Sequence, residues 1–184
     1  MKFKQTDLPG VIVIEPAVYQ DKRGSFFEGY NRDLFFKNGI TVDFIQDNHS
    51  LSKKGVVRGL HYQRAPHAQA KLLRVVRGEA FDVVVDVRRD SGTFGKWIGE
   101  VLSAENRRMV YVPAGFAHGF CALKDDTEFF YKVSAPYSPA DEAGVFWDDP
   151  AIGIRWPRID APFILSEKDT THPLLKDALT EVCR

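Results

Sequence analysis

The feature that most constrains the fold of this chain is a series of short apolar runs that recurs along most of its length. Several runs alternate at period two, and Gly, Pro, Asn or Asp residues bound them. They lie at residues 11–16, 26–30, 71–78, 80–88, 97–102, 109–113 and 128–134. β-Branched and aromatic residues in such alternation favour strands over helices. Many short strands at near-regular spacing predict an all-β fold, an antiparallel barrel or jelly roll.

Helical patterns are confined to two segments. Residues 32–38 end at Gly39, and a second pattern covers about 174–182. The Gly78 break between two runs predicts a hairpin. The segment 148–184 is rich in Pro and Asp, and we expect it to wrap the barrel as ordered loops within a single domain spanning 1–184.

Composition excludes several classes of function. The 25 Lys and Arg residues balance 25 Asp and Glu residues, so no global field favours nucleic acid or an anionic membrane as a partner. No stretch approaches the length of a membrane-spanning helix, and the N-terminus has no apolar signal region. We therefore expect a cytoplasmic protein. Cys121 and Cys183 have neither metal-ligand spacing nor a disulfide framework.

The chemically informative residues gather in two motifs. RGLHYQ contains His61 and is followed by Lys71, and PAGFAHGF contains His118. These motifs resemble the two halves of the cupin motif, with Gln63 in place of its second histidine and Lys71 near its glutamate. A divalent ion needs several neutral imidazole or carboxylate ligands, which this set does not supply. We therefore predict no metal and no other cofactor.

Two histidines and a lysine inside one barrel suit enolate chemistry. A histidine can remove a proton beside a ketone if a positive donor meets the developing enolate oxygen. His61 is the candidate base, Lys71 the donor and Tyr131 the acid on the opposite face. Structural roles remain open alternatives, because a lone histidine such as His118 is often a hydrogen-bonded core residue and Tyr131 alone fits core packing. His49, His67 and His172 support no functional prediction from spacing.

A longer set of motifs adds a resemblance to a known family. It comprises RGLHYQ, KLLRVVRGEAFDVVVDVR, SGTFGKW, LSAENRRM, VPAGFAHGF, EFFYKVSAPYSPADEAGVFWDDPAIGIRWP and LSEKD. Together these segments resemble the dTDP-4-dehydrorhamnose 3,5-epimerases from about Gly10 to Asp169. A departure such as Ala70, where glycine is expected, touches no proposed catalytic group.

The resemblance implies a role for each matched residue. It makes His61 the base at C3 and C5 of a dTDP-4-keto-6-deoxyhexose and Asp169 its partner. Lys71, with His118, would hold the C4 oxygen, and Tyr131 would be the acid. The matched ligand-contact positions are Arg23, Glu28, Gln46, Asp47, Asn48, Arg58, Tyr137, Glu142 and Lys168. Of these, the two arginines suit the diphosphate, Glu28 accepts from the thymine and Tyr137 stacks on it.

The resemblance also implies a homodimer and a place in dTDP-L-rhamnose synthesis for cell-surface polysaccharide such as lipopolysaccharide. Three alternatives stay open from the sequence. A mono-epimerase or a 3,4-ketoisomerase would act on the same kind of sugar nucleotide. A metal-free cupin that binds a sugar nucleotide without catalysis would belong to a different class.

Overall fold

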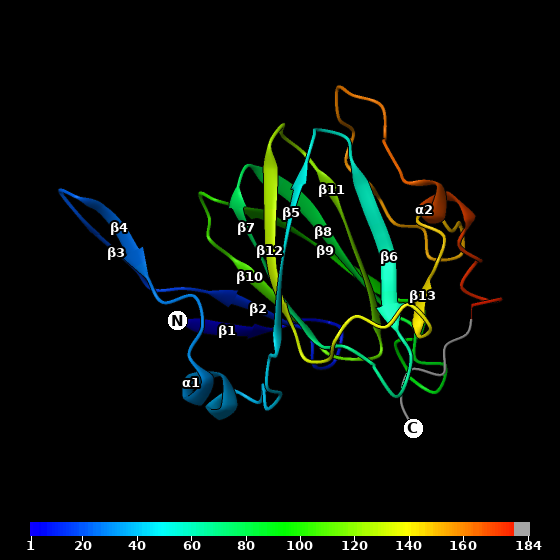
Figure 1. Ribbon diagram of the computed structural model, residues 1–184, viewed down its shortest axis with the longest axis horizontal. Coiled ribbons are helices and arrows are strands. Elements are labelled where there is room, and N and C mark those ends of the chain that lie inside the picture. Colours follow the sequence, from blue (N-terminus) through cyan, green and yellow to red (C-terminus); the bar gives the residue numbers. More distant parts are fainter. Residues whose placement is uncertain (179–184) are drawn as a thin grey trace.

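A computed structural model describes residues 1–178, and two antiparallel sheets form its body (Figure 1). The first sheet has six strands. In spatial order they are β1 (Lys2–Gln5), β2 (Ile12–Glu15), β10 (Met109–Val112), β7 (Lys71–Arg77), β12 (Thr127–Val133) and β5 (Gln46–Ser52).

The second sheet has five strands. In spatial order they are β13 (Glu142–Gly144), β6 (Val57–Gln63), β11 (Phe116–Ala122), β8 (Glu79–Asp86) and β9 (Trp97–Ser103). A separate hairpin, β3 (Val18–Asp21) with β4 (Gly24–Phe27), projects from the body as an arm (Figure 1). The described helices are the short α1 (Arg32–Lys37) and α2 (Glu167–Thr171). The predicted all-β cupin-type fold is confirmed.

The main core lies between the two sheets. It includes Val13, Leu73 and Phe129 from the six-stranded sheet and Val84 and Phe120 from the five-stranded sheet, all almost fully buried. Each of these side chains points inward because successive residues of a strand face opposite sides of its sheet. Burial of such aliphatic and aromatic surface is the main stabilising contribution to a fold of this kind.

Both sheets are also covered on their outer faces. The α1 region covers the six-stranded sheet, where the buried Phe35 packs with Ile14 and Met109. The C-terminal segment covers the five-stranded sheet, where Ile152 and Leu175 join the cluster that contains Leu60 and Val85. Strands covered on both faces lose the polar alternation of a half-exposed strand, which explains runs such as MVYV.

Three sequence-based predictions about local structure need correction. Gly78, with φ +77°, does not close a hairpin, because β7 and β8 belong to different sheets and the chain crosses between them there. Residues 174–178 form turns rather than a helix, and the rest of that predicted helix lies outside the described residues. The strand predicted at 26–30 ends at Phe27.

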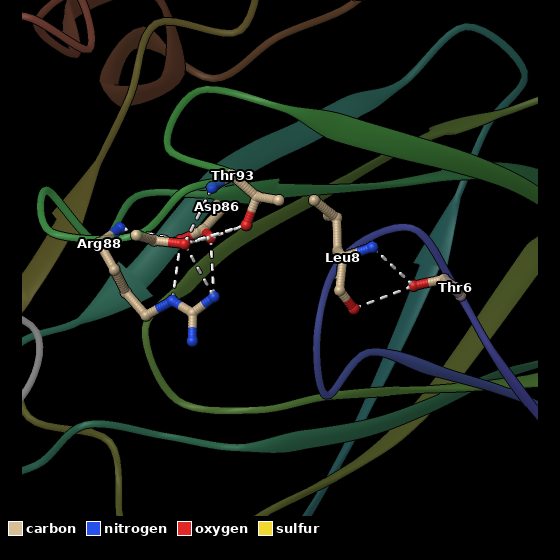
Figure 2. A network of polar contacts seen from close by, with 6 residues as sticks. Thr6, Leu8, Asp86, Arg88 and Thr93 are labelled. Atoms are coloured by element: carbon tan, nitrogen blue, oxygen red, sulfur yellow. Dashed lines mark hydrogen bonds and ion pairs between the residues drawn. The ribbon is translucent and has the colours of Figure 1, made fainter.

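A buried carboxylate fixes the loop after β8 (Figure 2). Asp86 accepts hydrogen bonds from the Arg88 guanidinium at 2.9 and 2.7 Å and from the Ser91 and Thr93 hydroxyls at 2.6 Å. Burial opposes its ionisation, but these hydrogen bonds outweigh burial and lower the pKa of Asp86 to about 2.

Among residues 1–178, no helix has the length and apolar character that crossing a membrane requires.

Candidate active site

A cavity of about 660 Å³ opens between the two sheets. Alternate residues of β5, β7, β11 and β12 line it, as strand geometry requires, whereas β6, whose pairing with β11 has a register shift, also contributes adjacent residues. The inward-facing set is Gln46, Asn48 and Ser50 on β5, Lys71 and Leu73 on β7, Phe129 and Tyr131 on β12, His61 and Gln63 on β6, and His118 and Phe120 on β11. The cavity therefore combines an apolar floor with ionisable groups from both sheets.

His61 and Asp169 form a short polar contact at this cavity. The His61 Nε2 atom lies 2.5 Å from Asp169 Oδ1, and the carboxylate is buried while the ring is partly open to the cavity. Burial opposes ionisation of Asp169. The hydrogen bonds from His61 and from the Ser166 hydroxyl outweigh it and hold the pKa of Asp169 below its ordinary value. This carboxylate therefore stays charged and orients the imidazole.

Asp169 is held in place by a helix cap. Ser166 is the N-cap of α2: its hydroxyl accepts from the Asp169 backbone N–H at 3.2 Å and donates to Asp169 Oδ2 at 2.9 Å. The sequence S-E-K-D places an acidic residue three positions after a capping serine, a known signal for the start of a helix. That signal would have predicted α2, which the periodicity did not reveal.

His118 lies opposite His61 on the neighbouring strand β11. The two strands can approach this closely because Gly119 has no side chain. A Cβ at this position would lie 2.8 Å from the Arg58 carbonyl oxygen, so a larger residue does not fit. The His118 Nε2 atom is 2.6 Å from the buried Asp82. The two histidines thus meet in one cavity, as the sequence predicts, and each has its own carboxylate.

Lys71 and Tyr131 face these histidines from the other sheet. Burial lowers the pKa of Lys71 to about 8, and the charge of Glu142 partly opposes that shift. Burial also raises the pKa of the Tyr131 phenol, which Arg58 partly opposes. At neutral pH the cavity therefore presents an ammonium group and a protonated phenol on the side opposite His61.

Most of the remaining predicted site residues lie at the mouth of the cavity, where they form polar contacts with one another or with neighbouring residues. Arg58 donates to the Ser52 hydroxyl at 3.2 Å, and the Gln46 amide donates to Asn48 at 2.8 Å. Tyr137 donates its hydroxyl proton to Glu142 at 2.8 Å, and Lys168 forms an ion pair with the same carboxylate. The six predicted residues of this group line the cavity together: Gln46, Asn48, Arg58, Tyr137, Glu142 and Lys168.

Three predicted residues do not lie in this cavity. Asp47 is on the outward face of β5, where it pairs with Lys132 at 2.8 Å, because it alternates with the inward-facing Gln46 and Asn48. Arg23 lies at the tip of the β3–β4 arm with its side chain 84% exposed and paired with Asp21. Glu28 follows the arm and accepts from Asn31 at 3.2 Å.

The structure also reveals residues that the sequence did not single out. The ring of His172 lies 5.5 Å from the His61 ring, and its Nε2 is 3.8 Å from Asp169 Oδ1. Asp82 supports His118 from behind. Neither role has a local sequence signal, because His172 is far from His61 along the chain and Asp82 is far from His118.

The residues at the cupin metal positions do not fit a metal ion. The Gln63 amide is fully engaged: it donates to the carbonyls of His67 and Pro136 and accepts from the backbone of Ser138. Lys71 is a buried cation, and His118 is bonded to Asp82 through Nε2. A hydrogen-bonded amide and a cation are poor metal ligands, so a metal ion at these positions has no part in the chemistry proposed below.

The chain is also similar to known proteins over nearly its whole length. The family model for dTDP-4-dehydrorhamnose 3,5-epimerase matches residues 5–177. The chain is 52% identical over 176 residues to the dTDP-4-dehydrorhamnose 3,5-epimerase of Salmonella typhimurium, which covers 95% of this chain and 96% of the relative.

Two solved structures extend the comparison. The dTDP-6-deoxy-D-glucose-3,5-epimerase of Legionella pneumophila, in complex with dTDP-4-keto-L-rhamnose, superimposes with a TM-score of 0.94 at 42% identity, covering 98% of this chain and 96% of that chain. A 3'-monoepimerase from Streptomyces bikiniensis, in complex with dTDP-quinovose, superimposes with a TM-score of 0.87 at 38% identity, covering 93% and 86%. From the matched motifs, the cavity and these comparisons, we conclude that the chain belongs to the dTDP-4-dehydrorhamnose 3,5-epimerase family.

Proposed function

We propose that this enzyme inverts C3 and C5 of dTDP-4-keto-6-deoxy-D-glucose through enolate intermediates, giving dTDP-4-keto-L-rhamnose for dTDP-L-rhamnose synthesis. The observation that carries the proposal is the opposition of groups across one cavity. His61 with Asp169 lies on one side, and Tyr131 with Lys71 lies on the other. Inversion needs this arrangement, since the proton must leave one face of the carbon and return to the other.

His61 is the base in this proposal. Asp169 accepts a hydrogen bond from the Nε2–H group of His61, which leaves the lone pair on Nδ1 to take the proton beside the ketone. When the ring becomes an imidazolium, the charged Asp169 stabilises it. The base therefore gains strength from a carboxylate that does not itself exchange protons with the substrate.

Lys71 and His118 stabilise the enolate. The negative charge develops on the C4 oxygen as the proton leaves, and a buried ammonium group interacts strongly with it because little water screens the pair. His118 reaches the same cavity from β11. Tyr131 then donates its proton to the opposite face, a role that suits a phenol whose burial keeps it protonated.

The nucleotide binds at the mouth of the cavity in this proposal. Arg58 offers a planar fork of donors to the diphosphate. Gln46, Asn48, Glu142 and Lys168 supply further polar contacts. Tyr137, which is 56% exposed at the rim, stacks on the thymine.

We also infer that the enzyme is a homodimer in which the β3–β4 arm of each subunit reaches the partner's cavity. The arm carries Tyr19 and Phe26, which are 67% and 71% exposed, and apolar surface of this size favours an interface. It also carries the exposed Arg23, in the turn between β3 and β4, and the arm projects from the body of the subunit (Figure 1). An exchange of arms would bring Arg23 and Glu28 to a diphosphate and a thymine bound in the partner.

Mixing two defective variants tests the arm exchange, in an assay at a sugar-nucleotide concentration far below KM, where the loss of a phosphate contact suppresses turnover. Subunits with His61→Ala are combined with subunits with Arg23→Ala after reversible unfolding. If Arg23 serves the partner, one site of each mixed dimer has both wild-type residues and activity returns. If Arg23 serves its own subunit, both sites stay defective and the mixture remains as inactive as its parents.

Turnover in deuterated water tests the catalytic proposal. An enzyme that inverts both carbons through enolates incorporates deuterium from the solvent at C3 and at C5. Label at C3 alone would identify a mono-epimerase, such as the Streptomyces relative. Absence of label at both positions, with nucleotide still bound, would identify a binding protein instead.

A further inference from the structure

His172 lies at the end of α2, beside the proposed catalytic pair. The Nε2 atoms of His61 and His172 lie 2.5 and 3.8 Å from the same carboxylate oxygen of Asp169, and the separation of 3.8 Å is too long for a hydrogen bond. The His172 Nε2 atom is buried and has no hydrogen-bond partner. A buried ring nitrogen in this situation is unusual and calls for an explanation.

We propose that His61, Asp169 and His172 form a binding site for a transition-metal cation such as Zn²⁺, which blocks the catalytic base when bound. The three ligand atoms lie within 4.8 Å of one another. Atoms bound to one zinc ion lie about 3 to 4 Å apart, because each bond is about 2 Å long. The upper limit of 4.8 Å exceeds this range, so the side chains must move closer together to bind one ion.

The chemistry of these residues fits zinc. Two imidazoles and one carboxylate are a common protein ligand set for this ion, with a fourth position left for water. The set differs from the cupin metal positions, with which it shares only His61. His61 and Asp169 line the open cavity, so an ion can enter from solvent.

The surroundings hold the ligands in position. The Ser166 hydroxyl binds the other oxygen of Asp169, which leaves Oδ1 to face the two histidines. The His172 ring lies against the backbone of Gly144, where an added Cβ would be 2.4 Å from Nε2. Fixed ligands and a hydrogen-bonded carboxylate are features that support metal affinity.

The nearby charges do not exclude a cation. Lys168, on the same helix as Asp169, forms an ion pair with Glu142 of β13, so its positive charge is largely compensated. A bound ion would occupy Nε2 of His61, the nitrogen that contacts Asp169, so the neutral ring would carry its proton on Nδ1. Nδ1 would then have no lone pair to take a proton from the substrate. The inhibition rests on the proposed role of His61, whereas the binding itself does not.

Isothermal titration calorimetry with Zn²⁺ and no nucleotide measures the binding directly, because a sugar nucleotide diphosphate itself binds divalent ions. We expect one ion per chain with a dissociation constant in the micromolar range for the wild type. His172→Gln keeps a neutral polar side chain but loses the ring nitrogen, and we expect at least about 100-fold weaker binding. His67→Ala is the matched control, since His67 pairs with Asp141 at 2.6 Å outside the catalytic pair.

Two results would overturn the proposal. The first is binding by His172→Gln that equals wild-type binding, or that falls no further than in His67→Ala. The second is the absence of binding to the wild type at millimolar Zn²⁺. Inhibition by Zn²⁺, normalised to the uninhibited rate of each variant, should follow the same order. Deuterium incorporation by zinc-free enzyme tests the epimerase function independently, so a failure of either claim is recognised separately.

Discussion

Lys71 should contribute to catalysis at a cost to stability, and Lys71→Met separates the two effects. The ammonium group is buried beside the cavity, and burial lowers its pKa from 10.5 to about 8. Methionine has a similar length and no charge. We therefore expect the variant to lose nearly all activity, since the enolate loses its positive donor, and yet to unfold less readily than the wild type.

The lowered pKa sets the size of the stability effect. A shift of this size corresponds to about 3 kcal/mol at neutral pH, which is an upper bound because methionine must also pack. The sign follows from linkage. The folded state holds the lysine proton less tightly than the unfolded state, so the destabilisation is fully present below pH 8. It diminishes as pH rises from 8 toward 10.5, where the folded wild type has shed the proton.

Urea unfolding at pH 7 and at pH 10 measures this difference. Lys71→Met should exceed the wild type by about 2 to 3 kcal/mol at pH 7, and the gap should shrink substantially at pH 10. Lys124→Met is a control at an exposed lysine, and it should change stability by less than about 0.5 kcal/mol. A variant that is less stable than the wild type at pH 7, or a gap that does not depend on pH, would refute the reasoning.

Three further predictions concern nucleotide binding, metal dependence and the loop after β8. Arg58→Ala should raise KM for the sugar nucleotide far more than it lowers kcat, because phosphate contacts are made equally in the ground and transition states. Unchanged affinity of the variant for dTDP would show that Arg58 does not bind the nucleotide. Extensive chelation should leave activity intact, and a loss that one divalent ion restores would contradict the proposed chemistry. Asp86→Asn should lower stability by about 2 kcal/mol at neutral pH, because the pKa of Asp86 is lowered to about 2 in the fold. That contribution is present above about pH 4 and is lost as pH falls toward 2, so thermal unfolding of variant and wild type should converge in acid.

The fold was largely predictable because strand periodicity is a local property. Alternation identified β2, β7, β8, β9, β10 and β12 of the two sheets, and Lys71 and Tyr131 lie on strands of this set. The strand β6, which carries His61, lies outside the apolar runs. The turn at Gly78 was mistaken for a hairpin, because a glycine with positive φ serves a sheet crossing as well as a tight turn.

Several features of the site are not visible in the periodicity of the sequence. Asp169 was assigned through family resemblance, and the structure shows the 2.5 Å contact across 108 residues of sequence. His172 had no periodic or motif signal, because its position depends on the end of a five-residue helix that periodicity does not detect. The family motif placed Asp47 beside two cavity residues, but strand alternation turns it outward.

The separation of roles between His61 and Tyr131 is the central claim, and proton exchange at C3 and C5 tests it most directly. Each variant is incubated with substrate in deuterated water, and label and configuration are measured at both carbons. His61→Ala should abolish exchange at C3 and C5 together. Tyr131→Phe keeps the base and the Lys71 donor, so exchange should partly survive while double inversion falls by about 10² to 10⁴ in rate. Exchange in His61→Ala, or double inversion by Tyr131→Phe at the wild-type rate, would contradict the account.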